Sequence, residues 1–272
     1  MIFGIAISHR PLISLHFNPR SPSGVESAIN GDNDTEKNAE VANDDTPSGA
    51  ILINDPYKLP QPLLAEDGTA ILTAQQWHNR RRPEILRLFA EHIYGTTPDA
   101  NIGLSYKTLE TETNALGGLA TRKQIRVEFS NHQGSAGMDL LLYLPNGVDG
   151  PSPVFLGLNY NGNHSIHRDP AIRLPQSRVD TPNGLPSPGD RGMRAWRWPV
   201  ETLLARGYGL ATVYYGDLYP DDSAGLEQSL IPLFFSNGQS APAADEWGAI
   251  GAWAWGLSRA LDYLRLDSDV DG

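Results

Sequence analysis

The pattern of apolar and polar positions predicts a β-hairpin in the middle of the chain. Residues 124–129 alternate polar and apolar side chains, and residues 138–144 form an apolar run. The segment between them contains Gly134 and Gly137, which favour a turn. Two strands joined in this way are typical of an antiparallel pair.

Two further apolar runs predict strands of a different kind. Residues 153–159 and 208–215 are almost continuously apolar, which is typical of strands buried on both faces of a sheet. Between them lie a Gly- and Pro-rich loop, residues 161–194, and a short helix that we expect over residues 198–205. A strand, a crossover helix and a second strand predict a parallel pair.

A helix is expected to begin after Thr73, to restart at Pro83 and to end at Gly95. Its apolar side is expected to pack into the core and comprises Ile85, Leu88, Phe89, His92 and Ile93. His92 is therefore interpreted as a structural residue rather than a ligand.

The clearest helical pattern covers residues 246–265, where apolar side chains recur every three or four positions and Asp245 can cap the first turn. The predicted core stripe comprises Trp247, Ile250, Ala254, Leu257, Leu261 and Leu264. A hairpin followed by strands that alternate with helices predicts an α/β protein, in the order of a three-layer α/β-hydrolase sandwich.

Composition divides the chain into two parts. Residues 21–50 carry seven acids against Lys37 alone and no aromatic residue, so they hold −6 of the formal charge of −11. Such a segment cannot bury enough apolar surface to offset chain entropy. We expect a disordered acidic leader over residues 1–50 and a folded domain over residues 51–272. The apolar start of the leader follows no Lys or Arg and is interrupted at His9, so it makes a poor signal peptide.

Overall charge and composition exclude several classes of protein. Lys and Arg number 21 against 32 Asp and Glu, which argues against a nucleic-acid binder. No apolar run approaches the roughly 18 residues of a membrane span. The absence of cysteine excludes disulfides, thiolate metal sites and a cysteine nucleophile.

One pentapeptide imitates a catalytic motif. Residues 256–260 (Gly-Leu-Ser-Arg-Ala) match the Gly-x-Ser-x-Gly nucleophile elbow except at the last position. An elbow needs a strand before the serine and a histidine after it in the chain. Ser258 instead lies within the predicted helix, and no His follows it. We therefore expect no catalytic residue at Ser258.

The loop after the first buried strand is the better candidate site, because open α/β sheets bind ligands at the carboxyl ends of their strands. Gly162 allows backbone N–H groups to face an anion, and the neighbouring amides supply donors. The candidate oxyanion-side or substrate-lining residues are Asn161, Gly162, Asn163 and His164. An ordinary turn that selects Gly and Asn for their conformations is the alternative interpretation.

Metal sites are weaker candidates, and we expect neither a metal nor another cofactor. His164, His167 and Asp169 carry zinc-binding atoms, but two histidines in an irregular loop form a non-specific pattern. The acidic loop after the second buried strand lacks calcium-loop spacing and is interpreted as solvated: Asp217, Asp221 and Asp222. A group of tryptophans fits either sugar stacking or core packing: Trp196, Trp198, Trp247, Trp253 and Trp255.

Several segments resemble the bacterial glucuronoyl esterases. They are residues 54–60, Trp77 with residues 81–85, Tyr94 with Gly95, residues 157–164, residues 214–217 and residues 247–264, of which the last is the most specific. The resemblance implies an α/β-hydrolase fold and a serine esterase that works without a metal. Members of the family cleave the ester between glucuronic acid on xylan and alcohols of lignin, so a polysaccharide-linked ester is the implied substrate.

The resemblance also implies where the catalytic residues lie. The family's nucleophile sits on the strand after the helix that residues 247–264 resemble, and residues 267–272 are similar to the turn into that strand. Serine, oxyanion arginine, acid and histidine are therefore expected beyond Gly272, and the chain is expected to be an inactive N-terminal fragment. An extracellular or periplasmic location is implied by the substrate. The alternatives are an acetylxylan or other carbohydrate esterase of the same fold and, in another class, a non-catalytic carbohydrate-binding module.

Overall fold

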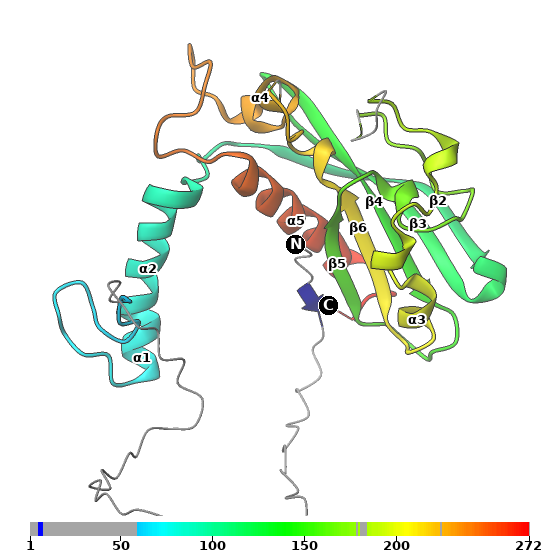
Figure 1. Cartoon of the computed structure of the whole chain (residues 1–272), viewed down its shortest axis with the longest axis horizontal. Coiled ribbons are helices and arrows are strands. Elements are labelled where there is room, and N and C mark those ends of the chain that lie inside the picture. Colours follow the sequence, from blue (N-terminus) through cyan, green and yellow to red (C-terminus); the bar gives the residue numbers. More distant parts are fainter. Residues whose placement is uncertain (1–4, 8–58, 178, 180–183, 224, 272) are drawn as a thin grey trace, which may run out of the picture.

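The computed structural model describes residues 5–7, 59–177, 179, 184–223 and 225–271 (Figure 1). Its strands are β1 (Ile5–Ile7), β2 (Gly103–Ala115), β3 (Ala120–Asn131), β4 (Gly134–Pro145), β5 (Val154–Asn159) and β6 (Gly209–Tyr214). Its α-helices are α1 (Ala74–Gln76), α2 (Arg82–Phe89), α3 (Val200–Leu204), α4 (Gly225–Gln228) and α5 (Ala249–Leu266). None of these helices has the length and apolarity of a membrane span.

Shorter helical segments complete the described elements. Two π-helical segments, Trp77–Arg81 and Ala90–Tyr94, extend the first helices. Single turns of 3-10 helix occupy Leu116–Gly118, Asn163–Ser165, Pro188–Asp190, Ala195–Arg197, Tyr215–Asp217 and Ile231–Phe234.

The strands of the described residues form one six-stranded sheet in the order β1-β5-β6-β4-β3-β2. The predicted hairpin is confirmed, because β3 and β4 pair antiparallel with Ile125 opposite Leu140. The predicted parallel pair of β5 and β6 is confirmed as well. The apolar pattern gives no sign of β2, since most of its side chains are polar and face solvent.

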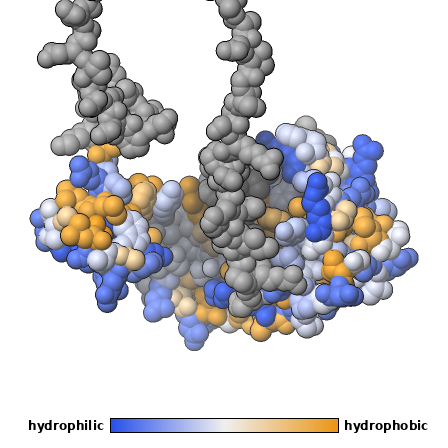
Figure 2. Space-filling model, turned by 90° about the horizontal axis from the view of Figure 1, so that it is seen from below, coloured by the Kyte–Doolittle hydropathy of each residue, from blue (hydrophilic) through white to orange (hydrophobic). Residues whose placement is uncertain are grey.

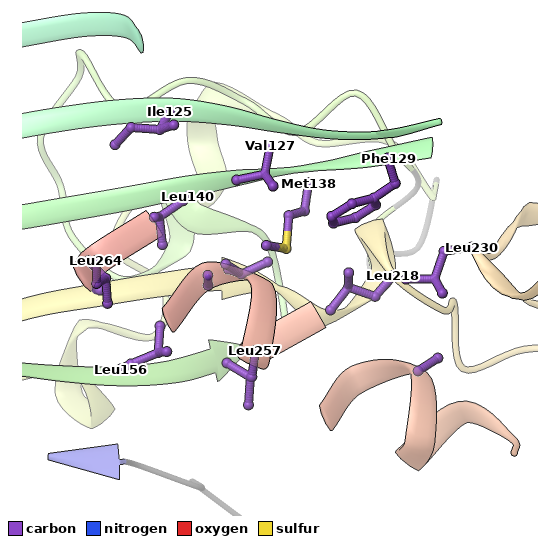
Figure 3. Packing of buried hydrophobic residues seen from close by; sticks show 14 of the residues in the cluster. Ile125, Val127, Phe129, Met138, Leu140, Leu156, Leu218, Leu230, Leu257 and Leu264 are labelled. Atoms are coloured by element: carbon purple, nitrogen blue, oxygen red, sulfur yellow. The ribbon is translucent and has the colours of Figure 1, made fainter. Parts of the chain in front are cut away.

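Helices cover both faces of the sheet, as in an α/β-hydrolase. Neighbouring residues of β4 show how the two cores arise, because successive side chains of a strand point to opposite faces. Leu140 and Leu142 belong to the core under α5, together with Leu257 of that helix (Figure 3). Leu141 and Tyr143 belong to the core on the opposite face, which α3 covers.

The stripe by which α5 meets the sheet differs from the predicted one. Asp245 does not cap the helix: the N-cap position belongs to Gly248, which makes no side-chain cap bond. Ile250 and Ala254 of the predicted stripe are exposed. The buried residues are Ala252, Gly256, Leu257, Ala260 and Leu264. Small side chains dominate this set because the helix packs closely, and a Cβ at position 256 would collide with Leu218.

The segment from α1 to Tyr94 forms an arm that stands apart from the sheet (Figure 1). Thr73 caps it through a capping box, and Gly95 ends it, both as predicted. The expected burial of its apolar side is wrong, since no residue of α2 is buried and Ile93 is 63% exposed. His92 is exposed too, so it is not a core residue. Hydrophobic residues therefore appear on the surface of the arm (Figure 2).

A backbone bridge joins the arm to the segment before α5. The Thr96 N–H donates to the Asp245 carbonyl at 2.8 Å, and the Trp247 N–H donates to the Thr96 carbonyl at 3.1 Å. Gly95 precedes this bridge with φ 78° and ψ 158°, a conformation that is essentially restricted to glycine. The direction of the arm therefore depends on this glycine.

Two segments contact the free edge of β5. β1, which lies inside the predicted leader, pairs with it antiparallel, and Ile7 is opposite Val154. Val270 forms a parallel bridge with Ser152, two positions earlier on the same edge. The rest of residues 1–50 falls outside the described residues, so the leader and the domain boundary at residue 50 stay predictions.

Candidate functional site

The loop that follows β5 is tied to the two neighbouring strands by asparagine side chains. Asn159, the last residue of β5, donates from Nδ2 to Asn163 Oδ1 at 2.6 Å and to Thr212 Oγ1 of β6 at 3.1 Å. Asn163 in turn donates from Nδ2 to the Asp139 carbonyl of β4 at 2.7 Å. These side-chain hydrogen bonds therefore hold the first turn of the loop against the carboxyl ends of the parallel strands β5 and β6.

All four residues predicted to line the site lie in this turn, and all four are buried. Asn161 is 1%, Asn163 7% and His164 0% exposed. Gly162 has φ 88°, and a Cβ there would collide with Pro175 and His164. Asn161 accepts a hydrogen bond from Arg194 Nε at 2.7 Å. The four residues therefore lie inside the loop and stabilise its conformation. Their oxyanion-side or substrate-lining role stays a prediction.

His164 is held neutral inside the loop. Burial, and secondarily the nearby Arg191 charge, lower the pKa of its imidazole, against a weaker opposite influence of Asp190. Neither ring nitrogen has a hydrogen-bond partner among the described residues. A neutral imidazole keeps one donor and one acceptor, so His164 can exchange hydrogen bonds with a group that enters the turn.

A buried ionic cluster fastens the middle of the loop to the sheet. Arg122 of β3 contacts Asp169 of the loop at 2.5 Å and Glu110 of β2 at 2.6 Å, and Tyr143 donates to Asp169 at 2.7 Å. Burial opposes ionisation of Asp169, but hydrogen bonds from Tyr143 and the Ala171 N–H and the charge of Arg122 outweigh it and lower its pKa. The cluster is therefore charged and paired at neutral pH.

The same contacts disfavour the zinc hypothesis. Asp169 faces Arg122 and Tyr143, and His167 accepts the Asp169 N–H at Nδ1. Across the part of the chain that the structure describes, no three metal-binding side chains converge. Asp169 and His167 therefore use their polar atoms in contacts that hold the loop in place.

Asp217 is not in a solvated loop, so this part of the sequence interpretation is wrong. It accepts hydrogen bonds from Ser177 Oγ at 2.5 Å and from the Asp139 N–H at 3.2 Å. Burial raises the pKa of Asp217 to about 6. It lines a small cavity at the ends of the strands together with Asp139, Asn163, Arg173 and Tyr214. Asp221 and Asp222, by contrast, are exposed.

We expect Asp217→Asn to flatten the pH dependence of stability between about pH 4 and pH 6. In this window unfolded Asp217 loses its proton while the folded state retains it, so the wild-type stability falls as pH rises from 3.8 towards 6. The rise in the pKa of Asp217 from 3.8 to about 6 corresponds to about 3 kcal/mol of lost stability at pH 7, a cost that the variant should not carry. Urea unfolding across this pH range measures the effect. Asp221→Asn is the exposed control, and an equal change in both variants would contradict the prediction.

Ser258 lies in the middle of α5 with an exposed side chain, where no sharp turn presents it. The rejection of Ser258 as a nucleophile is therefore consistent with its geometry. An elbow places the serine on a strained turn after a strand, and the residues before Ser258 are helical from Ala249 onwards.

The structure separates the tryptophans that the sequence groups together. Trp247 and Trp198 are buried at 1% and 8% exposure. Trp253 donates from Nε1 to the Tyr219 carbonyl, and Trp255 packs edge-on against Phe129 of the core. Trp196 is 73% exposed. Core packing accounts for the first four, whereas Trp196 has no such explanation.

Known proteins are similar to this chain in both amino-acid sequence and fold. A carbohydrate esterase, MZ0003, from an unknown prokaryotic organism is 41% identical over 224 residues, which cover 79% of this chain and 51% of that protein. A solved glucuronoyl esterase from Solibacter usitatus is 44% identical with a TM-score of 0.74, covering 80% of this chain and 56% of the esterase chain. The chain belongs to the glucuronoyl esterase family.

A further solved relative agrees with this assignment. A promiscuous CE15 esterase from the marine bacterial metagenome is 39% identical with a TM-score of 0.68, covering 80% of this chain and 55% of that chain. No protein-family model matches the chain. The chain spans about half the length of the curated relative it matches, so the likeness to glucuronoyl esterases concerns about half of such a protein.

Proposed function

We propose that this chain builds the N-terminal half of a serine esterase that cleaves the ester between glucuronic acid on xylan and an alcohol of lignin. The observation that carries the proposal is the 44% identity to the Solibacter usitatus glucuronoyl esterase, which extends over 80% of this chain. The position of the loop after β5 supports it, because enzymes with open α/β sheets bind their ligands at that end of the strands.

Within the proposal, this half positions the substrate and does not attack it. The asparagines of the turn and the Arg122 cluster fix the loop that would border the ester, so that it needs no reorganisation when charge develops on the substrate. The nucleophile, its acid and its histidine come from residues outside this sequence. Ser258 lies in the middle of α5, where no strained turn after a strand presents its hydroxyl, so it does not have the geometry of a nucleophile elbow.

A chimera tests the proposal. Residues 59–271 replace the matching part of the Solibacter usitatus glucuronoyl esterase, and the product is assayed with a benzyl ester of glucuronic acid and with acetylated xylan. We expect hydrolysis of the glucuronate ester and little release of acetate. A folded chimera that prefers acetylated xylan would favour the alternative carbohydrate esterase, and a folded chimera without turnover on either would contradict the proposal.

The 272-residue chain alone should not turn over the benzyl ester above the buffer rate. General-base activation of a serine needs a histidine within hydrogen-bond reach, and the proposal takes that histidine from outside this sequence. Hydrolysis by the chain alone that is lost in Ser258→Ala would contradict this expectation and would assign Ser258 a catalytic role.

A further inference from the structure

Ala195 and Trp198, which flank Trp196 and Arg197 in the chain, line a surface groove that the candidate site does not use. The groove has a volume of about 370 Å³ and runs between the loop after β5 and the start of α3. Its lining includes His167, Arg168, Trp198 and Glu201. None of its lining residues borders the small cavity that contains Asp217. The groove is therefore a second concave surface of this half of the fold.

Between Ala195 and Trp198, which line the groove, the chain carries an exposed aromatic ring and a cation. The Arg197 guanidinium lies 4.8 Å from the centre of the Trp196 ring, and both side chains are exposed. Arg168 lies along the same groove and is exposed as well. Among the described residues, neither Arg168 nor Arg197 forms a salt bridge with a carboxylate. Two cations thus remain available on a chain whose formal charge is −11.

Two arginines shortly before Arg197 in the chain, in contrast, form hydrogen bonds within the protein. Arg191 donates to the carbonyls of Asp169 and Ile172, and Arg194 donates to Asn161, so both are used to hold the loop. Arg197 instead packs on Trp196. A tryptophan face covers the apolar C–H face of a sugar ring, and a guanidinium binds a carboxylate through two parallel hydrogen bonds. Side by side, they match a sugar that carries a carboxylate.

We propose that the groove lined by Arg168, together with Trp196 and Arg197, which lie in the chain between its lining residues Ala195 and Trp198, is an anchoring site for a polysaccharide that bears uronic acid groups, separate from the site of ester cleavage. The choice of glucuronoxylan as its ligand rests on the proposed function. The sugar ring stacks on the free face of Trp196, and its carboxylate binds Arg197 or Arg168. The site holds the polymer near the esterase and takes no part in the chemistry.

Binding to the full 272-residue chain tests this site without any need for hydrolysis. Tryptophan fluorescence and isothermal calorimetry follow the titration with a xylo-oligosaccharide that carries one glucuronic acid and with the neutral xylo-oligosaccharide of equal length. We expect the acidic oligosaccharide to bind at least about tenfold more tightly and to weaken with salt. Equal affinities for both oligosaccharides, or no binding of either, would overturn the proposal.

Matched variants locate the binding. Trp196→Ala and Arg197→Gln should each weaken the acidic oligosaccharide about tenfold or more. Arg206→Gln should not, because Arg206 is exposed but donates to the Thr202 carbonyl and has no part in the stack of Arg197 on Trp196. Circular dichroism confirms that each variant is folded. Equal losses in Arg197→Gln and Arg206→Gln would assign the binding to general surface charge and overturn the proposed site.

The chimera separates a failure of this site from a failure of the proposed function. In a chimera that hydrolyses glucuronate esters, Trp196→Ala should raise KM for polymeric glucuronoxylan and leave kcat and the KM for the small benzyl ester unchanged. Unchanged KM for the polymer would refute the anchoring site while the esterase function stands. Oligosaccharide binding by the chain, with an inactive chimera, would refute the function while the site stands.

Discussion

Replacing Gly95 by alanine is expected to detach the arm from the sheet domain. An added Cβ at this position would collide with the backbone of Glu246 and Trp247, and the backbone conformation itself excludes side chains. We expect a loss of at least about 3 kcal/mol in the free energy of unfolding. Urea unfolding measures this loss, and hydrogen exchange at the Thr96 and Trp247 amides reports on the bridge.

Gly68→Ala is the matched control for that experiment. Gly68 also has a positive φ, 84°, but a Cβ there would meet nothing within 4 Å. Its cost is expected to be only about 1 kcal/mol, the penalty of a left-handed conformation without a collision. Similar losses for both variants would show that close packing of Gly95 against the backbone bridge of Thr96 and Glu246 does not explain the requirement for glycine at position 95.

Replacing Arg122 by leucine should destabilise the protein by about 3–5 kcal/mol and release the loop after β5. The change leaves two carboxylates, Asp169 and Glu110, close together without their cation, and Asp169 is buried. Removal of one partner from a buried ion pair costs more than the pair itself contributes. Chemical denaturation gives the stability, and limited proteolysis within residues 160–194 reports on the loop.

An exposed arginine provides the comparison for Arg122. Arg87 forms ion pairs with Glu66 and Glu91 on the arm, with its side chain 48% exposed. Arg87→Leu should therefore cost less than about 1 kcal/mol. If Arg122→Leu were as mild, the cluster would not anchor the loop. Partial recovery of stability in the double variant Arg122→Leu, Asp169→Asn would identify the unpaired carboxylate as the cause.

Local patterns predicted the elements that carry an apolar pattern of their own. The hairpin of β3 and β4 follows from its alternation and glycines, and the parallel pair of β5 and β6 from two apolar runs with a helix between them. The pattern cannot show β2, because an edge strand with polar residues on its exposed side has no apolar signature. Helical periodicity found α5 and the buried Leu257 and Leu264 of its stripe, but it missed Ala252 and Gly256, because close packing selects small residues there.

The arm shows a second limit of sequence patterns. An apolar side predicts that a helix packs against something, but on this side of the arm Phe89 is 42% and Ile93 63% exposed. The candidate site shows a third limit. The sequence located the turn of residues 161–164. It did not show that Arg122 pairs with Asp169 or that Asp217 accepts the Asp139 N–H, because these contacts join polar side chains that carry no periodic pattern.

The edge of β5 that faces away from β6 can pair with only one strand along its length. Pro153 directs its carbonyl to Gly209 of β6, so Ser152 and Val154 on either side of it direct their backbone groups to the opposite edge, where they meet Val270 and Ile7. A strand extended from Val270 in its present direction would therefore require the hydrogen-bonding groups of β5 that β1 occupies. The two pairings exclude each other, and β1 holds this edge with only three residues. A competitor for this edge would therefore have to displace only the three residue pairs of β1 and β5.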